Sequence, residues 1–183
     1  MEELGRAMAT FYYKHQVDTI SLGYDCRLSS PGFRDRLAKG LVESGINVID
    51  IGMGPTPLVY FSLFNLPVGG GVMITGSHNP ANENGFKVCL GKSTAFGDQI
   101  QEIGRIMEAK DYHSGSATLT NRPLAAEYIQ YLKGILHPGS KKIKTVVDAG
   151  NGTGNLVAVD LYKRLGFEVT DIFSEPDGHF PNH

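Results

Sequence analysis

Short apolar runs alternate with amphipathic segments along most of this chain, and this alternation limits the possible folds more than any other feature. Apolar residues at helical spacing predict helices over residues 2–14, 30–44, 57–64 and 98–109. The apolar runs between them predict strands over residues 19–24, 47–51, 68–73 and 86–90, the last antiparallel if it hairpins back. This order is typical of an α/β fold, here a mixed sheet layered between helices in an α/β/α arrangement.

A polar segment over residues 112–122, rich in Ser, Thr and Gly, indicates a domain boundary. The pattern then restarts with a predicted helix at 123–136, a strand at 144–148, a helix at 156–165 and a strand at 167–172. We therefore expect a first domain over residues 1–122 and a partial second α/β domain of similar architecture over residues 123–183.

Composition argues against several classes of partner. Of the 183 residues, 41% are hydrophobic and 20% are charged, as in a globular protein with its own core. The formal net charge of -2 provides no overall field that would recruit nucleic acid or a membrane surface, so an anionic ligand would need local cations. No apolar run approaches the roughly 20 residues of a membrane span, and the acidic start Met1-Glu2-Glu3 is unlike a signal peptide. Cys26 and Cys89 are too few for a disulfide framework, which fits a reducing, cytoplasmic compartment.

A tight polar turn follows the third predicted strand. Residues 74–80 (ITGSHNP) place a hydroxyl, an imidazole and an amide next to one another, and Pro80 biases Asn79 away from a helical conformation. A hydroxyl on a loop just past a buried strand is well placed for chemistry, because the strand fixes the loop while the loop meets solvent. An ordinary connection with a solvated Ser77 would explain the same residues.

The segment over residues 75–80 (TGSHNP), followed by NGFK at 84–87, resembles the phosphoserine loop of the alpha-D-phosphohexomutases. This superfamily includes phosphomannomutase and phosphoglucomutase, and the chain looks like its N-terminal portion. Three further stretches resemble the family in the same order, at residues 23–30 (GYDCRLSS), 147–152 (VDAGNG) and 176–183 (PDGHFPNH). Four motifs in one order are more specific than any one of them.

The resemblance implies an intramolecular phosphotransferase that interconverts hexose 1-phosphate and hexose 6-phosphate, of mannose or glucose, through a phosphoserine and a bisphosphorylated sugar. Ser77 would carry the phosphoryl group, because a hydroxyl can accept and return it. Lys87 would assist proton transfer, although an exposed strand lysine is the alternative. His78 would lie near the reacting hydroxyls, or else bond to the loop backbone. The resemblance also suggests that Asn79 contacts the substrate with His78 and Lys87, although Asn79 could simply shape the loop.

Arg27 resembles the last arginine of the Gly-Arg-Asp-x-Arg loop of the family, where Tyr24 replaces the first arginine. The resemblance places Arg27 near the phosphoserine, where its planar guanidinium could hold two phosphate oxygens, a catalytic and substrate-binding role. An ion pair with Asp25 is the alternative that the sequence leaves open.

The resemblance implies Mg²⁺ as cofactor, bound by the phosphate on Ser77 and by three aspartates of an Asp-Gly-Asp-x-Asp loop, with a hexose 1,6-bisphosphate as activator. No Asp-x-Asp-x-Asp pattern occurs in the 183 residues, so we expect the other metal ligands outside this chain. A short opening strand and the sugar-recognition domains would also be missing. The partners would be a phosphosugar and the remaining domains, without which we expect this chain to be inactive.

A second interpretation is a non-catalytic module that binds a sugar phosphate or a nucleotide. The glycine-rich turn over residues 150–154 (GNGTG) follows a predicted strand and precedes a predicted helix, a context that suits phosphate binding at a helix N-terminus. Its glycine spacing does not match the dinucleotide fingerprint. The family resemblance implies instead that this turn is structural.

Overall fold

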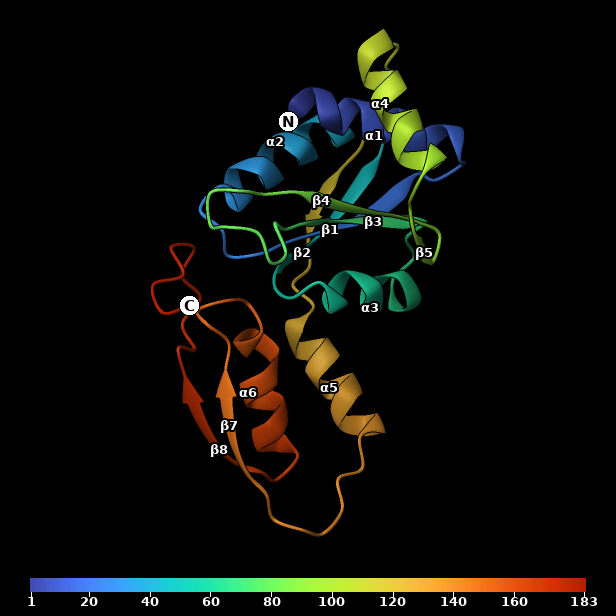
Figure 1. Ribbon diagram of the computed structural model, residues 1–183. Coiled ribbons are helices and arrows are strands. Elements are labelled where there is room, and N and C mark those ends of the chain that lie inside the picture. Colours follow the sequence, from blue (N-terminus) through green and yellow to red (C-terminus); the bar gives the residue numbers. More distant parts are fainter.

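The computed structural model describes residues 1–183 and contains two separate sheets (Figure 1). The larger sheet has six strands in the order β5-β4-β3-β1-β2-β6. These are β1 (Thr19–Tyr24), β2 (Asn47–Met53), β3 (Gly70–Ile74), β4 (Phe86–Leu90), β5 (Ser93–Thr94) and β6 (Leu119–Asn121). Strands β1, β2, β3 and β6 are parallel, whereas β4 runs antiparallel to β3 and β5 antiparallel to β4. The mixed sheet confirms the predicted α/β fold.

Helices cover both faces of this sheet (Figure 1). One face carries α1 (Glu2–Lys14), α2 (Ser30–Val42) and α4 (Asp98–Ala109), and the other carries α3 (Pro57–Asn65). A core of 18 buried residues joins α1, α2 and α4 to the strands. Helix α1 shows why the sequence forms these elements: its buried apolar side chains share one face, while two glutamates at its start and Lys14 at its end complement the helix dipole.

The smaller sheet belongs to the C-terminal part of the chain, defined here as residues 123–183. Its elements are α5 (Ala125–Ile135), β7 (Lys144–Asp148), α6 (Asn155–Arg164) and β8 (Glu168–Ile172). Strands β7 and β8 are parallel, and α6 connects them. We call residues 1–122 the N-terminal part; it contains the six-stranded sheet.

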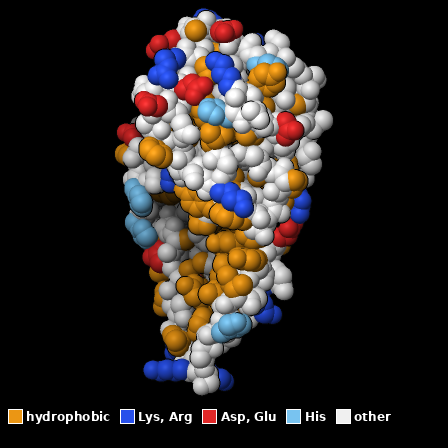
Figure 2. Space-filling model, turned by 90° about the vertical axis from the view of Figure 1, so that its right-hand side faces the viewer, with side chains coloured by type: hydrophobic (Ala, Val, Ile, Leu, Met, Phe, Trp, Pro, Cys, Tyr) orange, Lys and Arg blue, Asp and Glu red, His pale blue; other side chains and the backbone are white.

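One apolar core connects the two parts. Nine buried residues form it: Ile51, Leu58, Val59, Leu66 and Met73 from the N-terminal part, and Leu124, Ile129, Val157 and Leu161 from the C-terminal part. Figure 2 shows apolar side chains gathered in the lower half of the molecule, on the side where α3 and α5 lie in Figure 1. The exposed aromatic rings of Tyr60 and Phe64 on α3 and of Tyr131 on α5 line a surface hollow there.

Two short strands differ from the sequence-based expectation. Strand β6 lies within the segment that we predicted to be a boundary loop, yet it pairs with β2 in the larger sheet. All three residues of β6 are exposed, so no apolar pattern marks it. The two residues of β5 are exposed as well.

None of the helices has both the length and the apolar character that crossing a membrane requires.

Candidate active site

Ser77 lies at the exposed tip of the loop between β3 and β4, which we call the Ser77 loop (residues 75–85). Its base is closed by a hydrogen bond from the Thr75 amide to the Gly85 carbonyl oxygen, 2.9 Å long. The Ser77 amide donates to Thr75 Oγ1 at 2.9 Å. Ser77 adopts a left-handed conformation with φ of 54°, which costs a non-glycine residue about 1–2 kcal/mol. An anchored loop therefore holds this hydroxyl in a strained, outward-facing position.

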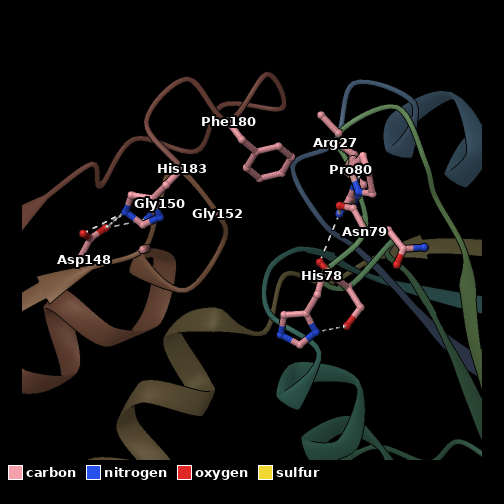
Figure 3. A pocket seen from close by; sticks show the side chains of 12 residues that line it. Arg27, His78, Asn79, Pro80, Asp148, Gly150, Gly152, Phe180 and His183 are labelled. Carbon is pink, nitrogen blue, oxygen red and sulfur yellow. Dashed lines mark hydrogen bonds and ion pairs between the residues drawn. The ribbon is translucent and has the colours of Figure 1, made fainter.

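His78 contacts the hydroxyl directly. Its Nδ1 atom lies 3.3 Å from Ser77 Oγ, and both side chains are exposed (Figure 3). Of the two positions that the sequence left open for His78, this contact favours the one beside the Ser77 hydroxyl. Asn79 holds the turn through its backbone, because its amide donates to the Gly76 carbonyl oxygen at 2.9 Å.

Arg27 follows β1 and is almost completely buried, at 2% exposure. Its Nε donates to Asp25 Oδ2 at 3.2 Å. Its Nη1 donates to the carbonyl oxygens of Pro80 and Glu83, and its Nη2 donates to those of Ser77 and Asn79. All four carbonyl groups belong to the Ser77 loop. A guanidinium has five N–H donors, so none is left for a phosphate.

The structure thus supports the Asp25 ion pair over direct phosphate binding by Arg27. Asp25 is buried too, and its Oδ1 accepts hydrogen bonds from the Arg27 amide at 3.0 Å and from Ser30 Oγ at 2.6 Å. A buried ion pair is tolerated when further hydrogen bonds satisfy both groups, as they do here. Arg27 therefore acts in this structure as a clamp on the backbone of the Ser77 loop.

A cavity of about 610 Å³ separates the Ser77 loop from the C-terminal part (Figure 3). The N-terminal part contributes Arg27, Ser77, His78, Asn79, Pro80 and Ala81 to its lining. The C-terminal part contributes Asp148, Ala149, Gly150, Gly152, Phe180 and His183. Three of the four predicted site residues beside Ser77, namely Arg27, His78 and Asn79, thus lie around one space.

Lys87 does not line this cavity. It lies half-buried on β4, where it pairs with Met73 of β3 and so shares the sheet face that α3 covers. This face looks toward the C-terminal part (Figure 1). No hydrogen bond joins Lys87 to Ser77, and the role of Lys87 in proton transfer stays a prediction.

The far wall of the cavity holds residues that sequence reasoning did not select. His183 Nε2 lies 3.0 Å from both carboxylate oxygens of Asp148 (Figure 3). The Gly150 amide, 2.9 Å from Asp148 Oδ1, lowers the pKa of this carboxyl, and His183 lowers it further. Asp148 ends a parallel strand, and ligands of α/β proteins bind beyond the carboxyl ends of such strands. That rule, applied to the predicted strand at 144–148, would have pointed to this wall.

Three backbone amides of the glycine-rich turn bond to other groups of the protein. The amides of Gly150, Asn151 and Gly152 donate to Asp148 Oδ1, to the Phe173 carbonyl oxygen and to the Ala149 carbonyl oxygen, at 2.9, 2.9 and 2.7 Å. A phosphate cradle needs such amides to be free and to point at the ligand. These three amides are therefore not available to a phosphate in this conformation.

The 183 residues also do not form a metal site of their own. No group of three or more His, Cys, Asp or Glu side chains is arranged to hold a cation. Ser77 alone would supply one phosphate ligand, which does not make a coordination shell for Mg²⁺.

Comparisons with known proteins point to one family. Residues 1–114 match the protein family described as phosphoglucomutase/phosphomannomutase, alpha/beta/alpha domain I. The chain is 40% identical over 182 residues to a phosphoglucomutase of Neisseria meningitidis serogroup B, covering 98% of this chain and 39% of that protein. It is 38% identical over 180 residues to a phosphomannomutase/phosphoglucomutase of Pseudomonas putida, with 98% and 39% covered.

The fold has a close match among crystal structures. A phosphoglucomutase/phosphomannomutase family protein of Burkholderia thailandensis superposes with a TM-score of 0.94 at 35% identity, covering all of this chain and 41% of that one. The chain thus spans about two fifths of the length of the curated relatives that it matches.

Proposed function

Because the chain belongs to the phosphoglucomutase/phosphomannomutase family, we propose that it carries the phosphoserine loop of an enzyme that interconverts hexose 1-phosphates and hexose 6-phosphates. The observation that carries this proposal is the Ser77 hydroxyl, exposed at the mouth of a cavity of about 610 Å³ on a loop that Arg27 fixes in place. Mannose and glucose phosphates are the proposed substrates, in keeping with the names of the relatives.

In the proposed reaction, a phosphoryl group on Ser77 Oγ passes to the free hydroxyl of a hexose monophosphate. The bond from Oγ to phosphorus breaks as the bond from the sugar oxygen to phosphorus forms. The proton of the sugar hydroxyl goes to a general base, and Oγ leaves as a hydroxyl after taking up a proton. The bisphosphate then turns around and returns its other phosphoryl group to Ser77 by the reverse steps.

Two side chains of this chain are proposed to move these protons. His78 Nδ1, 3.3 Å from Ser77 Oγ, is placed to exchange a proton with that oxygen. We assign the proton of the sugar hydroxyl to Lys87, on the sheet face that looks toward the cavity side of the molecule. Asn79 is proposed to contact the substrate from the loop. Mg²⁺ on the Ser77 phosphate is also proposed, with its other ligands from outside residues 1–183.

The deciding experiment uses the full-length protein and its Ser77→Ala variant. A carrier serine is a stable phosphomonoester, so the purified protein should contain a species about 80 Da heavier that phosphatase or substrate removes. Ser77→Ala should lose both this species and turnover of glucose 1-phosphate to glucose 6-phosphate. Ser116→Ala, which changes an exposed serine outside the cavity, should keep both.

The nucleotide-binding alternative makes the opposite prediction. It expects no heavier species, normal behaviour of Ser77→Ala, and thermal stabilisation of the protein by added nucleotide. Turnover of Ser77→Ala at the rate of the unchanged protein would rule out a phosphoryl carrier at this position.

A further inference from the structure

We propose that Phe180 and Gly178 position the Ser77 loop from the C-terminal part, by fixing the Arg27 clamp that holds the loop. This role concerns the conformation of the Ser77 loop. Its effect on catalysis rests on the proposed function of Ser77. It assigns a role to the 176–183 motif, which sequence reasoning linked to the family without any physical account.

The Arg27 guanidinium is held from two directions. Along its edges it bonds to the loop carbonyls, including those of Ser77 and Asn79 at 3.2 and 2.8 Å. The Phe180 ring covers it from the cavity side, with Cζ of Arg27 5.4 Å from the ring centre (Figure 3). A cation over an aromatic face is attracted by the ring, while its in-plane donors stay free to bond. Phe180 can therefore hold Arg27 without competing with the loop.

Gly178 brings the backbones of the two parts into close approach. A Cβ at this residue would lie 2.6 Å from the Cys26 carbonyl oxygen and 2.7 Å from the Leu28 amide nitrogen. Both are backbone atoms on either side of Arg27, so they cannot move aside as a flexible side chain would. Gly178 does not have a positive φ, so the approach and not the backbone conformation requires a glycine here.

The segment that carries Phe180 is anchored on the glycine-rich turn. Asn151 accepts hydrogen bonds from the Asp177 amide at 2.8 Å and from Asn182 Nδ2 at 2.7 Å, and its own Nδ2 donates to the Glu175 carbonyl oxygen at 2.9 Å. Phe180 itself has a φ of 48°, a costly conformation for an aromatic residue that persists only where the surroundings impose it. The C-terminal part thus holds Phe180 firmly against Arg27.

These contacts form one connected series from Asn151 through Phe180 and Arg27 to the backbone of Ser77. Because all donors of Arg27 are used, a shift of the guanidinium moves or breaks its bonds to the loop. The placement of Ser77 therefore depends on the C-terminal part, although no residue of that part bonds to the Ser77 loop directly in this series.

The test compares full-length protein with Phe180→Ala and Phe180→Tyr, using amide hydrogen exchange of residues 76–84 and steady-state kinetics. Phe180→Ala should raise exchange in this loop several-fold and lower kcat at least about 5-fold with little change in KM, since a misplaced reacting group mainly slows the chemical step. Phe180→Tyr keeps the aromatic face and should restore both values. If Phe180 contributed only to general stability, Phe180→Ala would lower Tm. It would not lower kcat at a nearly unchanged KM, and Phe180→Tyr would not rescue the loop exchange and kcat together.

Gly178→Ala gives an independent test in case Phe180→Ala folds poorly. It should also increase exchange in the loop, because the added methyl group pushes the two backbones apart. Gly139→Ala is the matched control, since a Cβ there meets nothing within 4 Å. Unchanged exchange over residues 76–84 in folded Gly178→Ala and Phe180→Ala would overturn the proposal. Amide exchange reports on the conformation of the loop even if Ser77 carries no phosphate. A failure of the proposed function would appear as normal turnover of Ser77→Ala, so it can be told apart from a failure of this proposal.

Discussion

A Cβ on Gly76 would lie 2.6 Å from Cζ of Arg27, so the guanidinium occupies the space that a side chain at residue 76 would need. The glycine beside the candidate carrier serine is therefore part of the clamp. The Ser77 loop folds around a buried cation, Arg27, that comes from the loop after β1. The conformation of the Ser77 loop depends on how closely its backbone approaches this cation.

Gly76→Ala should disturb the loop for this reason. The added methyl group would also meet the Glu83 carbonyl oxygen at 2.5 Å, so the loop or Arg27 must shift. We expect a loss of about 1–3 kcal/mol in the free energy of unfolding, the usual cost of overpacking, and a lower kcat. Urea unfolding and the mutase assay measure the two effects. Gly104→Ala on α4, where a Cβ meets nothing within 4 Å, should be neutral or slightly stabilising.

Arg27→Lys separates a clamp from a phosphate ligand. Lysine keeps the charge but has only three donors on one nitrogen, so it cannot reach all the loop carbonyls and Asp25 together. We expect a loss of about 1–3 kcal/mol in the free energy of unfolding and faster amide exchange over residues 76–84. If Arg27 instead held substrate phosphate, KM would rise while the stability stayed unchanged.

Ser77→Gly and Ser77→Ala should both abolish turnover but differ in stability. The left-handed φ of 54° at this residue costs alanine about 1–2 kcal/mol and glycine almost nothing. After the greater flexibility of unfolded glycine is subtracted, we expect Ser77→Gly to be more stable than Ser77→Ala by up to about 1 kcal/mol. Denaturant unfolding of the two variants checks this order, and a more stable Ser77→Ala would mean that the loop relaxes around residue 77.

Lys87→Met keeps the apolar stem and removes the charge. If Lys87 moves a proton during transfer, kcat should fall by about 100-fold or more, the usual contribution of general acid–base catalysis. Thermal unfolding should show that the fold is intact. Turnover at the normal rate would return Lys87 to the role of a partly exposed strand lysine.

The Asp148 carboxyl should titrate below its ordinary range, because the Gly150 amide and then His183 favour its charged form. A carboxyl with a lower pKa in the folded state stabilises the fold above its unfolded pKa, and this contribution disappears as the pH falls through the folded pKa. The effect on stability should therefore appear only below about pH 4 and be small, since Asp148 is solvent-exposed. An NMR titration measures it. His183→Ala should raise the midpoint of the Asp148 titration only part of the way to the ordinary value, because the Gly150 amide remains. An ordinary midpoint for Asp148 in the unmutated protein would contradict the geometry.

The sequence was sufficient for most elements of the fold. Helix α1 and strands β1, β4 and β7 begin and end where the apolar spacing predicts. In β7 only an alternation of half-buried and exposed side chains marks the strand. Strand β6 could not be found in this way, since its pairing uses only backbone groups and its side chains are exposed.

The candidate site was predictable to the same degree. Ser77 and His78 stand out in the sequence because a hydroxyl and an imidazole lie side by side in a turn after a predicted strand. The clamp role of Arg27 does not, since its partners in the Ser77 loop are carbonyl oxygens that every residue type possesses. The contact between Arg27 and Phe180 joins distant segments that no local spacing connects.

The apolar core that contains Ile51 and Met73 from one part and Ile129 and Val157 from the other has a consequence for unfolding. Opening either part on its own would uncover the buried face of its neighbour, so neither can open at low free energy while the other stays intact. Heating or denaturant should therefore melt both sheets in a single cooperative transition. The sheets divide the chain near residue 122, but the protein should unfold as one unit.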